Sequence, residues 1–229
     1  MNKRIIVALD LDNKNKALEL AKKLRKEVYA FKIGHEFFYN FGIKGYKEIY
    51  NICPRIFLDL KLHDIPNTVH KGLKAISKLK PIFTTIHISG GDEMQKISLL
   101  KKNKKTKILG VTILTSLDEK QTLKYYKEKN VSILVKKFAS YAKKNNLGGL
   151  VCSPLEISIV RKEVGKKMIL VVPGIRLEKK SKSKKDDQKR TLTPKEAINL
   201  GADFLVIGRP IIESKNPLET IKKINLSIQ

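Results

Sequence analysis

The feature that most constrains the fold of this chain is the alternation of short apolar, β-branched runs with amphipathic segments from one end to the other. Strands that alternate with helices are typical of a parallel sheet. The predicted strands are 4–10, 28–33, 55–61, 82–88, 107–114, 149–153, 168–172 and 203–207. The predicted helices are 13–26, 35–50, 67–79, 94–103, 132–144, 154–163, 194–200 and 217–224. This number of units in 229 residues favours an α/β fold of the closed kind, a single (β/α)8 TIM barrel, over an open doubly wound sheet.

One segment interrupts the alternation after the seventh predicted strand. Residues 177–190 contain a lysine-rich, low-complexity run at 179–185. Long loops in compact domains are usually lids or disordered segments. No linker divides the chain, so we expect one domain over residues 1–229, with a mobile loop at about 177–190 that grips a phosphate.

The net charge of +26 raises the question of a nucleic-acid partner. The basic residues are mostly lysines, they are spread along the chain, and many fall on the polar faces of predicted helices. No zinc-finger spacing or aromatic-interleaved basic motif accompanies them. We therefore interpret the charge as a solvated surface that favours an anionic substrate, and expect no nucleic-acid ligand.

Cysteine content and apolar run lengths bear on the compartment. Cys53 and Cys152 are far apart and have no metal-ligand spacing, which is typical of a reduced protein. The apolar run near the N-terminus ends at Asp10, too early for a signal peptide, and no run approaches membrane length. These features predict a cytoplasmic protein without a membrane partner.

Charged and polar residues gather where the predicted strands end. In TIM barrels the active site lies at the carboxyl ends of the strands, and a row of charges there is hard to explain by packing. The residues at these ends are Asp10, Lys32, Asp59, Lys61, His87, Thr115, the segment 173–176, Gly208 and Arg209.

The third predicted strand carries the most chemical information. With a period of two, Asp59 and Lys61 project from one face of the strand, and Asp64 lies just past its end. Carboxylates around a lysine would keep it charged and oriented to deliver a proton to carbon, and Asp59 would press a negative charge against a substrate carboxylate. The alternative is an ion pair that serves structure alone.

The end of the eighth predicted strand indicates a phosphate site. Gly208 and Arg209 follow this strand directly. Loops after the seventh and eighth strands of such barrels commonly bind phosphate through backbone N–H groups, and an arginine adds bidentate pairing. The alternative is a glycine turn beside a surface arginine.

The motifs, taken together, resemble those of the orotidine 5'-monophosphate (OMP) decarboxylases. The sequence FLDLKLHDIPNTV at 57–69 is similar to the family signature D-x-K-x-x-D-I-P-N-T. Further motifs of the family follow in order along nearly the whole chain: VALD at 7–10, FKIG at 31–34, HxxGG at 87–91, VTILTS at 111–116, VPGIR at 172–176, DDQxR at 186–190 and IGRPI at 207–211. The lysine-rich stretch within 177–190 is the one departure.

The resemblance implies an enzyme that converts OMP to UMP in pyrimidine biosynthesis, with no metal and no organic cofactor. CO₂ leaves C6 of the orotate ring, and Lys61 protonates that carbon. It also implies a homodimer with shared active sites, in which Asp64 and Thr68 reach the neighbouring subunit. The implied catalytic residues are Lys61, Asp59, Asp64 and Lys32. The implied substrate-binding residues are Asp10 and Lys32 at the ribose, Thr115 at the pyrimidine, Pro173, and Arg176, Gln188, Gly208 and Arg209 at the phosphate.

Three other readings remain open from the residues. His63 and His87 invite a metal site of the ribulose-phosphate epimerase kind, which needs several convergent His and acidic ligands. Related Mg²⁺-dependent barrels, 3-keto-L-gulonate 6-phosphate decarboxylase and hexulose-phosphate synthase, share D-x-K-x-x-D, but the IPNT at 65–68 and the DDQxR loop argue against them. A basic nucleic-acid-binding barrel would bind DNA tightly and in a salt-sensitive way.

Overall fold

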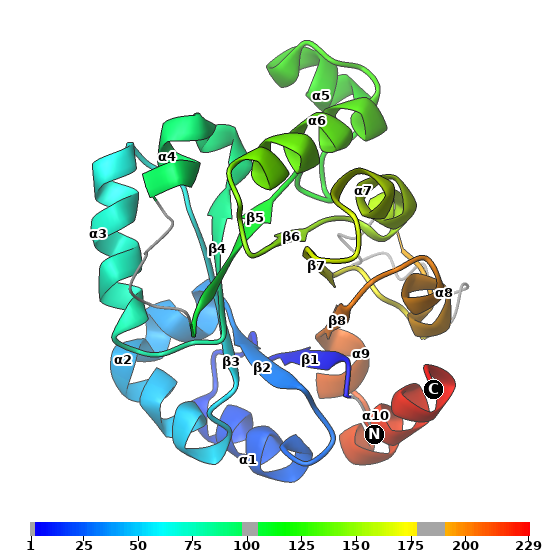
Figure 1. Cartoon of the computed structure of the whole chain (residues 1–229). Helices are drawn as coiled ribbons and strands as arrows, with labels where there is room; N and C mark the ends of the chain where they lie inside the picture. Colours follow the sequence, from blue (N-terminus) through cyan, green and yellow to red (C-terminus); the bar gives the residue numbers. More distant parts are fainter. Residues whose placement is uncertain (1–2, 98–104, 178–190) are drawn as a thin grey trace.

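In the computed structural model, eight parallel strands form a closed barrel in which each strand pairs with the next and β8 pairs with β1 (Figure 1). The structure describes residues 3–97, 105–177 and 191–229. The strands are β1 (Ile5–Ala8), β2 (Ala30–Ile33), β3 (Ile56–Leu62), β4 (Phe83–His87), β5 (Lys107–Val111), β6 (Gly149–Val151), β7 (Ile169–Val172) and β8 (Phe204–Ile207). The predicted TIM barrel is therefore confirmed.

Helices surround this ring of strands, as Figure 1 shows. The α-helices are α1 (Lys14–Leu24), α2 (His35–Ile52), α3 (Pro66–Ser77), α4 (Gly91–Ile97), α5 (Glu119–Tyr126), α6 (Val131–Lys144), α7 (Ile157–Val164), α8 (Pro194–Asn199), α9 (Arg209–Ile212) and α10 (Pro217–Ser227). Two short 3-10 turns, η1 (Ile88–Gly90) and η2 (Pro154–Glu156), precede α4 and α7. No helix among the described residues is long and apolar enough to cross a membrane.

Alternation along each strand divides the buried side chains into two layers. Outward residues such as Leu58 and Ile86 join the large cluster between the strands and the helices. Inward residues such as Phe57 and Phe83 form a smaller cluster inside the barrel. Aromatic rings fill the end of this interior where the strands begin: Phe83 contacts Phe57 with centroids 5.9 Å apart and Phe204 at 5.7 Å. The barrel is thus packed at that end, which leaves the opposite end for a site.

Several predicted boundaries differ from the structure. Strand β1 ends at Ala8, two residues before the predicted end at residue 10. Strand β3 extends one residue further than predicted, to Leu62. Strand β5 ends at Val111, whereas the prediction extended it to residue 114. The next residue still bonds to β6, since Thr112 N donates to Val151 O at 3.2 Å. Helix α4 begins at Gly91, before the predicted start, and residues 98–103 of that prediction lie outside the described residues.

Two helices were not predicted. Helix α5 has a single buried residue, Thr122, so its sequence shows no apolar stripe, and a capping box between Asp118 and Gln121 stabilises its first turn. Helix α9 has four residues, too few to show a helical period.

Candidate active site

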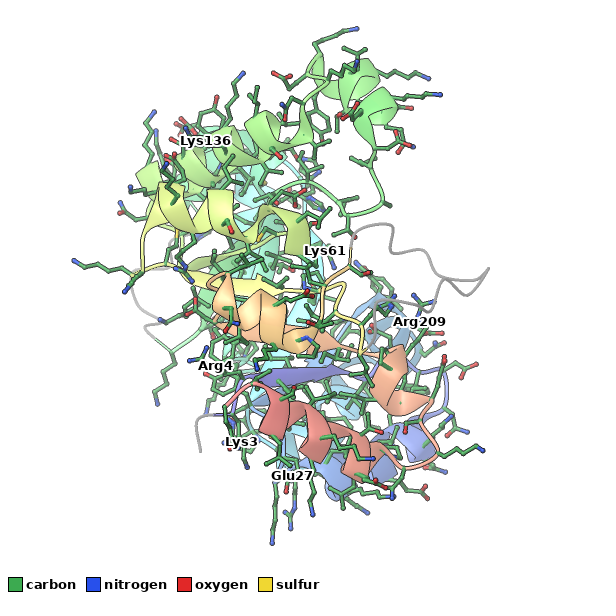
Figure 2. The ribbon with its side chains drawn as sticks, turned by 90° about the vertical axis from the view of Figure 1, so that its right-hand side faces the viewer. Lys3, Arg4, Glu27, Lys61, Lys136 and Arg209 are labelled. Carbon is green, nitrogen blue, oxygen red and sulfur yellow. The ribbon has the colours of Figure 1, made fainter. Side chains whose placement is uncertain are left out.

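A cavity of about 570 Å³ opens where the strands end. Figure 2 shows Lys61 and Arg209 at this end of the barrel and Arg4 at the opposite end. The predicted site residues that line the cavity are Asp10, Lys32, Asp59, Lys61, Thr115, Pro173, Arg176, Gly208 and Arg209. Lys16, Glu36 and Glu213 also line it. The barrel therefore brings together most of the residues that the strand ends predicted.

A bulge in β3 sets the position of Lys61. Leu58 pairs with Thr84 and Leu62 with Ile86, so β3 uses four steps where β4 uses two. Lys61 lies inside this irregular stretch with φ of 44°, a conformation that is uncommon for residues other than glycine. Bulges occur next to active sites because they redirect a side chain.

Asp59 and two lysines form a compact charged network inside the barrel mouth. The Lys61 ammonium lies 2.8 Å from Asp59 Oδ2, and the Lys32 ammonium lies 3.7 Å from the same oxygen. Lys32 also donates to both carboxylate oxygens of Asp10, at 3.0 and 3.1 Å. Asp59 and Lys32 are buried, while Lys61 and Asp10 are partly open to the cavity. A substrate in the cavity would therefore meet Lys61 directly.

The pKa values of the buried pair follow from this geometry. Burial alone would raise the pKa of Asp59, but the Lys32 and Lys61 ammonium groups outweigh burial and hold that pKa below its usual value. Burial alone would lower the pKa of Lys32, but the carboxylates of Asp59 and Asp10 outweigh it and hold that pKa above its usual value. Both residues are therefore charged at neutral pH.

Gly34 leaves the space that this network occupies. A Cβ atom at Gly34 would lie 2.5 Å from Asp10 Oδ1 and 2.9 Å from Lys32 Nζ. Both distances are shorter than van der Waals contact, so any larger residue at this position would displace the ion pair. The glycine of the FKIG motif is thus required by the site.

The β8 side of the cavity has a different construction. Gly208 directly follows β8 and is the N-cap residue of α9, which begins at Arg209. Arg209 is exposed at the cavity wall, and Arg176 reaches the same cavity from the segment after β7. Arg176 N donates to Leu192 O at 3.0 Å, which joins the two ends of the loop predicted at 177–190. Exposed cations beside a glycine backbone are suited to binding a phosphate.

Two predicted site residues do not line this cavity in the described part of the chain. Asp64 and Thr68 are both exposed, and Asp64 Oδ1 accepts a hydrogen bond from Ile65 N at 2.6 Å. Gln188, and with it most of the predicted phosphate-gripping loop, lies outside the described residues.

The two histidines that suggested a metal site lie side by side. The rings of His63 and His87 have centroids 5.3 Å apart. Burial of His87, with His63 and Lys61 nearby, lowers its pKa to about 4. Among the described residues, no three His, Cys, Asp or Glu side chains converge on a possible metal position. His87 is therefore a neutral ring at neutral pH, and it lies beside the exposed ring of His63.

Thr85 is a site residue that the sequence did not reveal. Its hydroxyl lies at hydrogen-bond distance from both Asp59 and Lys61 of the charged network. A threonine in a buried strand is common for reasons of β propensity alone. The alternation of side chains along β4 that places Phe83 and His87 inside the barrel also places Thr85 there. This alternation was the one sequence feature that could have indicated Thr85 as a site residue.

The comparisons with known proteins agree with this site. The model of the Orotidine 5'-phosphate decarboxylase / HUMPS family matches residues 3–224. The chain belongs to this family. The resemblance that the linked motifs indicated is thereby confirmed.

Relatives of this family are similar to the chain over nearly its whole length. An orotidine 5'-phosphate decarboxylase of Wolbachia pipientis subsp. Culex pipiens is 45% identical over 225 residues, which cover 98% of each protein. One from Carboxydothermus hydrogenoformans is 41% identical and covers 94% of this chain and 92% of its own. The crystal structure of orotidine 5'-phosphate decarboxylase from Lactobacillus acidophilus superimposes with a TM-score of 0.83 at 35% identity, and covers 99% of both chains.

Proposed function

We propose that this chain decarboxylates OMP to UMP in pyrimidine biosynthesis, without a metal or an organic cofactor. The observation that carries the proposal is the Asp59 carboxylate held between the ammonium groups of Lys61 and Lys32 in the cavity. The OMP decarboxylases to which the chain is 40–45% identical in sequence support the choice of substrate.

The proposed reaction needs only the charges of this network. The carboxylate of the substrate lies against Asp59, whose negative charge favours its loss as CO₂. The C6–carboxyl bond breaks and its electron pair stays on C6 of the ring. Lys61 then gives C6 a proton from its ammonium and regains one from solvent. Lys32 keeps Asp59 ionised throughout, since it lies beside the same carboxylate.

The remaining cavity residues would hold the substrate in that position. Asp10 and Lys32 are suited to bind the ribose hydroxyls, because they form a polar pair at the wall of the cavity. We assign Thr115 and Pro173 to the pyrimidine end. We assign the phosphate to Arg209, Arg176, the Gly208 backbone and, from the family motif, Gln188.

Incubation with OMP tests this function directly. We expect release of CO₂ and formation of UMP in equal amounts, at a rate that EDTA does not change. A rate abolished by EDTA and restored by Mg²⁺ would instead support the reaction type of the Mg²⁺-dependent sugar-phosphate barrels. No consumption of OMP would reject the proposal.

We further propose that the chain forms a homodimer with shared active sites. Asp64 and Thr68 are exposed just beyond β3, outside the cavity that their motif partners line. Ile65 between them is 67% exposed, so this segment presents an apolar side chain that a second subunit could cover. A two-fold interface through this segment would let each subunit complete the other's site.

Mixed dimers test the sharing. Lys61→Ala and Asp64→Ala are each expected to be inactive alone. In a mixed dimer one site carries both changes and the other carries neither, so random mixing should restore about a quarter of all sites. Recovery well above either variant alone supports a shared site. Absence of recovery, with mixed dimers shown to be present, would mean that Asp64 acts in its own subunit.

Cell fractionation tests the compartment that we propose, which is the cytoplasm. Both cysteines are free and buried, as in a reduced protein. We propose one functional domain over residues 1–229 and no nucleic-acid ligand. Binding to duplex DNA that is tight and falls steeply with salt would contradict the last point.

A further inference from the structure

Thr85 contacts the carboxylate of Asp59 and the backbone of Lys61 through one hydroxyl. Its Oγ1 donates to Asp59 Oδ1 at 2.9 Å and accepts from the backbone N–H of Lys61, also at 2.9 Å. The side chain is fully buried on β4, opposite the bulge of β3. A hydroxyl supplies one donor and two acceptor positions, so both bonds form at once.

The two carboxylate oxygens of Asp59 have different partners because of this contact. Oδ2 faces the ammonium groups of Lys61 and Lys32, at 2.8 and 3.7 Å. Oδ1 is held by Thr85 on the other side. Rotation of the carboxylate about its Cβ–Cγ bond would break the bond to Thr85, so the hydroxyl fixes the plane of the carboxylate relative to the lysines.

The bond to Lys61 replaces a contact that the sheet cannot make. In a regular parallel pair every second residue of a strand donates its N–H to a backbone carbonyl of the neighbouring strand. The bulge removes Lys61 from that pattern and leaves it at φ of 44°. The Thr85 hydroxyl accepts the N–H instead, and so anchors the backbone from which the Lys61 side chain extends.

We propose that Thr85 is the positioning residue of the site, whose hydroxyl sets Asp59 and Lys61 at their working separation. The expected effect of Thr85 on turnover rests on the proposed function. Its expected effect on the position of Lys61 rests on the two hydrogen bonds alone. Thr85 touches no substrate in this role. It acts through Asp59 and Lys61.

The preceding residue supplies a matched control. Thr84 is also buried on β4, but it projects from the opposite face, and its hydroxyl has no hydrogen-bond partner among the described residues. Both threonines are therefore β-branched residues of one strand with nearly equal burial. They differ in what the hydroxyl contacts, so Thr→Val at each position separates that contact from strand packing.

Kinetics of purified variants give the first measurement. Loss of a hydrogen bond to a charged group predicts a kcat lower by about 10- to 100-fold in Thr85→Val, with the Kd for UMP nearly unchanged. Thr85→Ser keeps the hydroxyl and should recover most of the lost kcat. Thr84→Val should stay within about twofold of the wild type, since its hydroxyl makes no bond to lose. If thermal unfolding shows that Thr85→Val is not folded, Thr85→Ala replaces it in both measurements.

Amine labelling of Lys61 gives a measurement that does not depend on turnover. The chain is treated briefly with acetic anhydride, and acetylation of Lys61 is followed by peptide mass spectrometry with Lys14 as the internal reference. Release of the Lys61 backbone predicts labelling faster by about threefold or more in Thr85→Val, and unchanged in Thr84→Val.

The two measurements together decide the proposal. It requires both the fall in kcat and the faster labelling, so either one left at the wild-type level in the Thr85→Val variant overturns it. Equal effects in Thr84→Val overturn it too, because they would reflect packing of β4. If the wild-type chain does not convert OMP, the proposed function fails by itself, and the labelling alone decides the role of Thr85.

Discussion

On the β2–β4 side of the barrel mouth, Lys32, Asp59 and Lys61 are held by one another and by Thr85, whereas on the β8 side Arg209 extends from an exposed position after Gly208. The first side is a network in a low-dielectric setting. There the removal of one charge leaves another buried and uncompensated. On the second side Arg209 is exposed at the cavity wall, so its removal leaves no buried charge at that position.

This difference in construction suggests a division of labour. Groups that must be placed accurately for bond breaking and proton transfer are buried and bonded, because a displacement of about 1 Å is costly to the rate. Groups that capture a charged ligand from water are exposed, because they act on encounter and affinity. Substitutions on the β2–β4 side should therefore change kcat, and substitutions on the β8 side should change binding.

Lys61→Ala should show the largest effect, on the β2–β4 side. It removes the proposed proton donor while the ribose and phosphate contacts stay, so kcat should fall by at least about a thousandfold. The affinity for UMP, measured by calorimetry, should remain measurable. The division fails if the variant keeps more than about a tenth of the wild-type turnover, because a general acid typically contributes about a hundredfold or more.

A second lysine serves as the control for that variant. Lys14 pairs with Glu48 at 3.1 Å and does not line the cavity. Lys14→Ala removes the same charge from the chain and should leave turnover unchanged. A comparable loss in both variants would point to net charge, and not to the network.

Arg209→Ala should have an intermediate effect, on the β8 side. Loss of a charge-assisted contact to phosphate predicts weaker binding of OMP and UMP by about 10- to 100-fold. Orotidine, the nucleoside without the phosphate, should bind and react as it does with the wild type. An unchanged affinity for UMP would place the phosphate elsewhere, and Arg25→Ala, outside the cavity, controls for loss of an arginine.

The sequence predicted the β2–β4 network in part, for reasons specific to these residues. Strict alternation brought Asp59 and Lys61 to one face, and the order of strands placed Lys32 beside them. The bulge of β3 was not predictable, because no glycine or proline marks it in 56–62. Alternation along β4 separates Thr85, inside the barrel, from Thr84, but nothing in the sequence indicated that the Thr85 hydroxyl bonds to Asp59 and Lys61.

Hydrophobic periodicity also predicted only some of the helices. Apolar stripes predicted the helices that pack on the barrel, such as α6 with its five buried residues. Helix α5 has almost none, and a capping box holds it, so periodicity was the wrong signal there. The spacing Asp118-x-x-Gln121 was visible in the sequence and would have predicted its start.

His87 gives the smallest expected effect, and it tests whether the β2–β4 side resists additional positive charge. Burial, His63 and Lys61 lower the pKa of His87 to about 4, whereas an unfolded histidine titrates near about 6.5. Between these values the unfolded chain binds a proton that the folded chain does not. Stability should therefore fall as the pH falls from 7 to 5, by about 1 kcal/mol from this residue once its partial exposure is discounted. Urea unfolding at both pH values measures the change. His87→Gln should lose less stability over that range than the wild type. Equal pH dependence in the wild type and His87→Gln would mean that burial and the neighbouring groups do not lower the pKa of this histidine.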